Sequence, residues 1–146
     1  MANLTDKGMV ATASTTIDAP ISKVWDALTN PDVIKKFMFG TETVSDWKEG
    51  SPIVWRGTWK EKPYEDKGVI LKIEPEQMLQ YTHFSPLSGA EDLPENYHTL
   101  TYRLTKEDDK TAVSLSQDKN SSEEELREAQ TMWEMMLASL KKVLEA

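Results

Sequence analysis

Two histidines and two tyrosines are the side chains of this sequence whose type and spacing could support chemistry. His83 and His98 are its only histidines, and an imidazole can relay a proton, respond to pH near neutrality or hold a polar ligand group. Tyr81 and Tyr102 could donate hydrogen bonds to a ligand or act as general acids. The alternative is that all four rings pack in the core and bond to backbone or water. Two histidines supply only two ligands, so we predict no metal site.

The sequence carries no motif of a known catalytic or nucleotide-binding class. It lacks the G-x-S-x-G turn of hydrolases, the phosphate-binding loops, the H-E-x-x-H zinc motif and the calcium loop. Cysteine is absent, which excludes disulfides, thiolate metal sites and cysteine nucleophiles. We therefore predict no cofactor and no catalytic residue, and the sequence favours a non-enzymatic role over an enzyme.

Length and charge narrow the class of protein further. The chain has 146 residues and a net charge of −8, which suits one domain and argues against nucleic-acid binding. No segment approaches the roughly 20 apolar residues of a membrane span, and the first residues lack a signal-peptide pattern. We expect a disordered N-terminus over 1–8 and a single cytoplasmic domain over 9–146, as a monomer or weak homodimer.

The elements that would position the rings can be predicted from patterning. A β-branched run over 9–17 predicts a strand, and the Asp18-Ala19-Pro20 sequence then opens a short helix. The Asn30-Pro31 pair ends that helix and starts a second one. Ser122 and Glu125 form a capping box that begins a long amphipathic helix over 122–144. Between the helices, turn residues separate β-rich segments near 41–47, 52–60, 67–74, 77–84, 97–105 and 111–118.

Short connections predict antiparallel pairing and a definite register. The loop after residue 84 would place His83 opposite His98 and Tyr81 opposite Leu100, and the turn at 106–110 would place Tyr102 opposite Leu115. The turn at Pro75 would pair Ile73 with Leu79 and Leu71 with Tyr81. A connection over 61–67 would pair Trp59 with Val69 and Trp55 with Ile73.

These registers gather the large apolar side chains on one face of the sheet, which the C-terminal helix would cover. Gly57 leaves a gap on that face between two tryptophans, and we expect a strand bend, a void or both there. The predicted inner face consists of Ile53, Trp55, Trp59, Val69, Leu71, Ile73, Leu79, Tyr81, His83, His98, Leu100, Tyr102, Leu104, Val113 and Leu115.

Several segments resemble one family, the activator of heat-shock protein 90 ATPase homologues of the START-like (SRPBCC, Bet v-type) superfamily. They are I-D-A-P-I-S-K-V-W-D-A-L-T-N-P (17–31), G-V-I-L-K-I-E-P-E-Q-M-L-Q-Y-T (68–82), H-F-S-P-L-S-G (83–89), E-N-Y-H-T-L-T-Y (95–102) and the terminal helix with Trp133. The resemblance implies an α+β helix-grip fold. It has a curved antiparallel sheet of about seven strands, two short helices after strand 1, and a long C-terminal helix over a hydrophobic cavity.

The function expected from these observations is non-catalytic binding of a small hydrophobic or amphipathic molecule between sheet and helix. One alternative is a protein-interaction module that regulates a chaperone or stress-response partner, and another is an aromatase- or cyclase-type enzyme. The predicted ligand-binding residues are Trp55, Trp59, Tyr81, His83, His98, Tyr102, Met132, Trp133 and Met136.

Overall fold

The computed structural model describes residues 9–59, 61–86, 89–120 and 122–146, so the disorder expected over 1–8 lies outside the described residues. The elements, in chain order, are β1 (Met9–Ile17), α2 (Ile21–Thr29), α3 (Pro31–Phe37), β2 (Glu42–Ser45), β3 (Pro52–Trp59), β4 (Lys62–Glu74), β5 (Met78–His83), the 3₁₀ turn η2 (Pro94–Asn96), β6 (His98–Glu107), β7 (Lys110–Asn120) and α4 (Glu123–Glu145).

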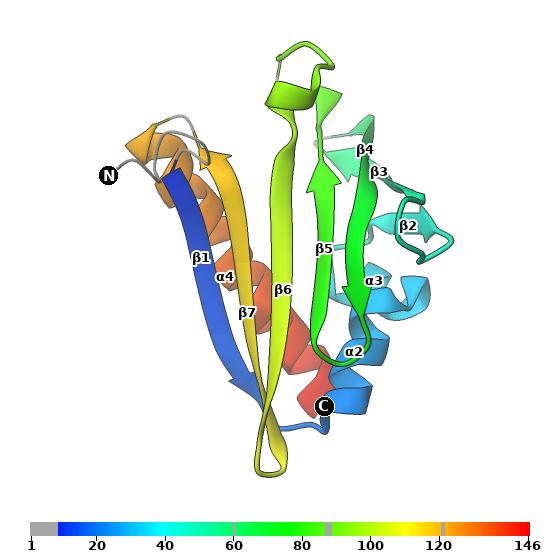
Figure 1. Cartoon of the computed structure of the whole chain (residues 1–146), viewed down its shortest axis with the longest axis vertical. Coiled ribbons are helices and arrows are strands. Elements are labelled where there is room, and N and C mark those ends of the chain that lie inside the picture. Colours follow the sequence, from blue (N-terminus) through cyan, green and yellow to red (C-terminus); the bar gives the residue numbers. More distant parts are fainter. Residues whose placement is uncertain (1–8, 60, 87–88, 121) are drawn as a thin grey trace.

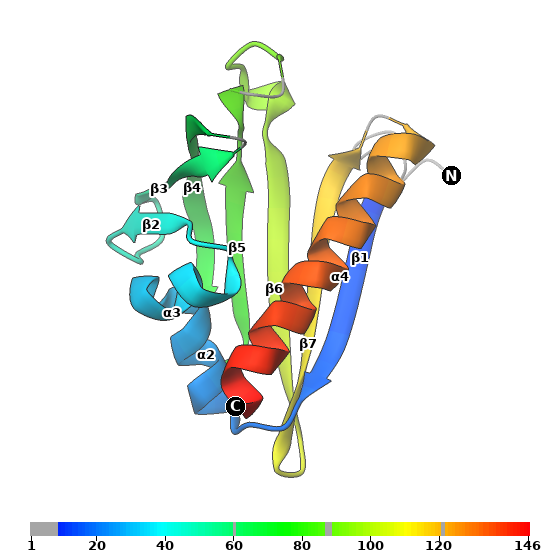
Figure 2. The ribbon, with the colours of Figure 1, turned by 180° about the vertical axis from the view of Figure 1, so that it is seen from behind.

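The strands form one curved antiparallel sheet in the order β1-β7-β6-β5-β4-β3-β2 (Figure 1). The long helix α4 runs diagonally along one side of this sheet, over β1 and β7, and the short helices α2 and α3 lie on the same side (Figure 2). This arrangement confirms the predicted α+β helix-grip fold, with two short helices after strand 1 and a long C-terminal helix. Among the described helices, none is both long and apolar enough to cross a membrane.

Local capping explains where two of the helices begin. The Asn30 side chain accepts a hydrogen bond from the Asp32 backbone N–H at 3.0 Å, with Pro31 in the first turn of α3. Ser122 caps α4 in the same way, because its hydroxyl accepts from the Glu125 N–H at 3.1 Å. The predicted Ser122 cap and the predicted extent of this helix are both confirmed.

The core lies between α4 and the inner face of the sheet. Along α4 the buried residues recur at helical spacing, including Trp133, Leu137 and Leu140. They pack against inward-facing strand residues such as Leu79 and Leu115, each about 1% exposed. Burial of this apolar area stabilises the fold and favours packing of the helix on the sheet.

The predicted registers hold in the central strands. His83 pairs with His98 and Tyr81 with Leu100 between β5 and β6, and Tyr102 pairs with Leu115 between β6 and β7. The two histidines therefore lie side by side at one end of the sheet, as expected. Ile73 also pairs with Leu79, across the turn at Pro75.

The prediction for the β3–β4 connection is wrong. Trp59 pairs with Lys62 instead of Val69, and Trp55 pairs with Asp66 instead of Ile73. Glu61 has a positive φ of 67° just before β4, which begins at Lys62 and not near residue 67. The residues assigned to a connection are thus the first half of a 13-residue strand.

The predicted pairing of Leu71 with Tyr81 is also wrong, because Tyr81 pairs with Ile70. A register shift follows Ile70 in β4, and a bulge of one residue turns the neighbouring side chains to opposite faces. Ile70 is consequently fully buried, while Val69 and Leu71 are 40% and 44% exposed. These two residues belong to the outer face.

Gly68 marks the bend at which β4 leaves β3 and joins β5. A Cβ atom at this position would lie 1.7 Å from the Thr82 backbone oxygen, so no other residue fits without moving the backbone. Next to it, the Val69 N–H donates to the Thr82 hydroxyl oxygen at 2.9 Å. This close contact brings the first half of β4 against the end of β5, where His83 lies.

Candidate functional site

A cavity of about 420 Å³ lies between the sheet and α4. Strands β3 to β7 form its floor, α4 forms one wall, and the segment after α3 forms the other. Its lining residues are Met38, Phe39, Thr41, Trp55, Thr58, Tyr64, Asp66, Tyr81, His83, Ser85, Asn96, His98, Leu100, Gln117, Met132, Trp133 and Met136.

Most of the residues expected to bind a ligand border this cavity. They are Trp55, Tyr81, His83, His98, Met132, Trp133 and Met136. Tyr102 lies one layer deeper, 2% exposed, with its ring centroid 6.0 Å from that of Tyr81. The side chain of Trp59 lies outside the described part of the chain.

Two lining residues of β4, Tyr64 and Asp66, were not predicted from the sequence, because their segment has the pattern of a connection. Gly57 lies opposite Tyr64, and a Cβ atom on this glycine would lie 2.6 Å from the Tyr64 hydroxyl oxygen and 2.8 Å from its ring. The gap expected at Gly57 is therefore filled by a tyrosine ring from the next strand. The Tyr64 hydroxyl is hydrogen-bonded to the Thr41 hydroxyl at 2.8 Å.

An aromatic cluster forms the centre of the cavity floor. The Trp55 ring lies 5.0 Å from the rings of both Tyr81 and His83, inclined by 53° and 62°. Inclined arrangements at this separation are favourable contacts between aromatic rings. Trp55 and Tyr81 are each 4% exposed, so both rings are almost fully buried where they border the cavity.

The tyrosine pair beneath the cavity stays uncharged at neutral pH. The Tyr81 hydroxyl donates a long hydrogen bond of 3.4 Å to the Tyr102 oxygen. Burial raises the pKa of Tyr81 well above its usual value, and the neighbouring Tyr102 raises it further. Burial also raises the pKa of Tyr102 to about 12.

Asp66 and His83 form a carboxylate–imidazole pair at the edge of the floor. Asp66 Oδ2 lies 2.9 Å from His83 Nε2, and the two side chains are 15% and 25% exposed. The other carboxylate oxygen, Oδ1, is buried and accepts no hydrogen bond from the described residues. A buried carboxylate with spare acceptor capacity is costly unless it is paired.

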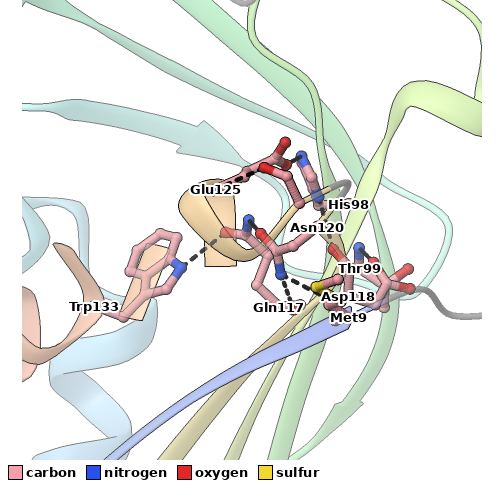
Figure 3. Close-up of polar contacts among 9 residues, drawn as sticks. Met9, His98, Thr99, Gln117, Asp118, Asn120, Glu125 and Trp133 are labelled. Atoms are coloured by element: carbon pink, nitrogen blue, oxygen red, sulfur yellow. Dashed lines mark hydrogen bonds and ion pairs between the residues drawn. The ribbon is translucent and has the colours of Figure 1, made fainter. Parts of the chain in front are cut away.

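A hydrogen-bond network joins α4 to the end of the sheet (Figure 3). The Trp133 indole N–H donates to Gln117 Oε1 at 2.8 Å, and the Gln117 amide donates to Asn120 Oδ1 at 3.2 Å. Asn120 in turn donates to the Met9 backbone oxygen at 2.9 Å. The network satisfies the polar atoms of Trp133 and holds its ring at the cavity wall.

His98 borders the cavity beside this network and has a defined tautomer. Its Nδ1 lies 2.8 Å from the Asp118 backbone oxygen, and a carbonyl oxygen can only accept, so Nδ1 carries the proton. In the neutral ring Nε2 is then an acceptor, and it lies 3.9 Å from Glu125 Oε1.

Two exposed apolar side chains mark the mouth of the cavity. Phe39 is 68% exposed and Met132 is 50% exposed, and both belong to the lining. Phe39 has a positive φ of 56° and is followed by Gly40 at 90°, so the chain turns sharply here and presents the ring outward. No group of three or more acidic or histidine side chains that could hold a metal ion occurs within the described ranges.

The sequence matches one protein family, and the fold is similar to several solved structures. Residues 18–145 match the family described as "Activator of Hsp90 ATPase homolog 1-like protein". A Cytophaga hutchinsonii protein with a known solution structure is 54% identical, with a TM-score of 0.84 over 96% of both chains. CalU16 from Micromonospora echinospora is 27% identical, with a TM-score of 0.73 over 92% of this chain and 75% of CalU16.

A more distant relative in structure is the Aha1 dimer from Colwellia psychrerythraea. It is 20% identical, with a TM-score of 0.72 over 94% of this chain and 96% of the Colwellia chain, and this similarity shows the fold alone. No curated protein matches the sequence at a significant level.

Proposed function

The chain belongs to the family of activator of Hsp90 ATPase homolog 1-like proteins, and from this premise and the site geometry we propose that it binds a small hydrophobic or amphipathic molecule without transforming it. The ligand would occupy the cavity between the sheet and α4. Ligand cavities of proteins commonly measure about 300–1,000 Å³ and combine apolar walls with a few polar groups. The cavity of about 420 Å³ is the observation that carries the proposal.

Different lining residues would contact different parts of the ligand. Trp55, Trp133 and Met136 would supply apolar contact area, while His83 and His98 would orient a polar group of the ligand. Tyr81 and Tyr102 would support the floor from below, since the two hydroxyls are bonded to each other. Trp59 remains a predicted contact.

Entry and exit would occur between α4 and the segment after α3. The exposed side chains of Met132 and Phe39 flank this opening. Two methionines on α4 make a matched test of this route, because Met132 borders the cavity whereas Met135, 59% exposed, does not. Both positions can accommodate a larger side chain, since at least half of each methionine is exposed to solvent.

We expect Met132→Trp to weaken binding of a two-ring probe, 2-naphthol, by about tenfold or more, because the indole narrows the mouth and enters the cavity. Met135→Trp should bind the probe like the wild type. Binding is followed by ¹H–¹⁵N shifts of the tryptophan indole groups, and urea unfolding checks that both variants are folded. Equal affinities for the two variants, or no binding to the wild type, would contradict the proposal.

A second candidate function is protein interaction, and exposed apolar residues on the outer face of β2 to β4 favour it. Val44 is 54% exposed, and Val69 and Leu71 are 40% and 44% exposed. The family name points to an Hsp90 ATPase as a partner. If this surface acts on such a chaperone, Leu71→Glu should abolish stimulation of the chaperone ATPase and Met132→Trp should leave it intact.

The enzyme alternative, of aromatase or cyclase type, has less support. A general acid at neutral pH needs a pKa near the working pH, whereas burial raises the pKa of Tyr81 and its proton is already donated to Tyr102. A cytoplasmic location, a stress-response role and a monomeric or weakly dimeric state stay predictions, and native mass spectrometry tests the last of these.

A further inference from the structure

Several polar groups that border the cavity are already hydrogen-bonded within the protein, whereas one carboxylate oxygen of Asp66 has no partner among the described residues. The Trp133 indole N–H donates to Gln117 Oε1, and one N–H of the Gln117 amide donates to Asn120 Oδ1. The Tyr81 hydroxyl donates to Tyr102, outside the lining. The single donors of Trp133 and Tyr81 are therefore not free to meet a ligand.

Each neutral histidine of the lining offers one ring nitrogen as a hydrogen-bond acceptor. In neutral His98 the proton is on Nδ1, so Nε2 carries a lone pair. In neutral His83 the ring nitrogen facing the Asp66 carboxylate must donate, since an ionised carboxylate only accepts, and Nδ1 is then the acceptor.

Asp66 is the strongest acceptor of the set. An ionised carboxylate has about four lone-pair positions, and the described residues place one partner on this one, through Oδ2. Rotation about the last side-chain bond of an aspartate is soft, so either oxygen can turn toward the cavity. No lysine, arginine or second acid is among the described lining residues, so with both histidines neutral Asp66 gives the cavity a negative charge.

We propose that the cavity selects ligands whose apolar body carries a hydrogen-bond donor, a hydroxyl or N–H group, and discriminates against carboxylates, with Asp66 as the specificity-determining residue. This inference rests on the proposed function and names the chemical class of its ligand. A donor on the ligand would satisfy the unpaired acceptor capacity of the carboxylate in a site of low polarity, where such a bond is strong. An anionic ligand would meet a like charge instead.

Three probes of nearly equal size separate these properties: 2-naphthol donates a hydrogen bond, 2-methoxynaphthalene cannot donate, and 2-naphthoate is an anion. We expect the wild type to bind 2-naphthol about tenfold or more tightly than 2-methoxynaphthalene, and to bind 2-naphthoate most weakly. In Asp66→Asn the preference for 2-naphthol should shrink and binding of 2-naphthoate should become stronger. A variant that merely loosens the fold would not gain affinity for one probe.

Glu65→Gln is the matched control, because it removes the same charge one residue away on the outer face. Glu65 accepts from Arg56 Nε at 2.7 Å and its side chain is 58% exposed, so all three affinities should equal those of the wild type. Equal binding of 2-naphthol and 2-methoxynaphthalene by the wild type, unchanged in Asp66→Asn, would overturn the inference and leave the proposed function standing. Failure of the wild type to bind any of the three probes would overturn both.

Discussion

At the scale of single residues, the side chains around the cavity were predictable where pattern alone decides their direction. Trp55, Tyr81 and His98 alternate with polar residues along their strands, so their inward orientation followed from the strand period. Asp66 could not be found in this way. Its role depends on a carboxylate–histidine contact across two strands, and the pattern around it, with Pro63 and several charges, reads as a connection.

The buried tyrosine pair gives a pH-dependent test at this scale. Unfolded tyrosines ionise near pH 10, whereas Tyr102 ionises near pH 12 in the fold and the pKa of Tyr81 is also raised. Their contribution to stability is therefore complete below pH 10 and is lost as the pH rises from there toward 12, because the unfolded chain releases protons first.

Tyr81→Phe removes one of these two groups. Between pH 10 and 11.5 the free energy of unfolding should fall less steeply in the variant, by about 1.4 kcal/mol per pH unit. Urea unfolding at a series of pH values measures both slopes, and the difference in slope is independent of any general loss of stability. Parallel slopes would show that the Tyr81 hydroxyl ionises normally in the folded protein.

At the scale of elements, most of the fold followed from sequence, and the error lay in one strand. The cap at Ser122, the proline at the start of α3 and the short turn between β6 and β7 each have a local cause. The start of β4 does not, because Pro63 lacks an N–H and is disfavoured in strands. Pairing with β3 overrides that preference, and the bend at Gly68 then depends on the close approach of another strand.

Gly68→Ala tests that bend. The new methyl group would collide with the Thr82 backbone oxygen, and a backbone cannot move aside as a side chain does, so we expect a loss of about 3 kcal/mol or more in the free energy of unfolding. Gly57→Ala is the comparison, because its methyl meets only the Tyr64 ring. Gly57→Ala should lower the free energy of unfolding by less than Gly68→Ala does. Urea unfolding ranks the two variants, and the reverse order would contradict the close approach at Gly68.

At the scale of the whole molecule, the curved sheet and diagonal helix enclose space that side chains leave unfilled. The sequence predicted this architecture through the resemblance and the one-sided apolar pattern. Whether the interface is packed or hollow depends on how neighbouring rings fit, as at Gly57 and Tyr64, and no pattern of residue types specifies it. The cavity is the property from which the binding function is inferred.

The most direct test of that function is to locate a bound probe by intermolecular nuclear Overhauser effects. Met136 borders the cavity and is 2% exposed, whereas Met135 is exposed outside it. With the protein saturated by 2-naphthol, we predict cross-peaks from the probe to the Met136 methyl group and to the Trp55 indole. Cross-peaks confined to exposed groups such as the Met135 methyl would contradict binding between sheet and helix.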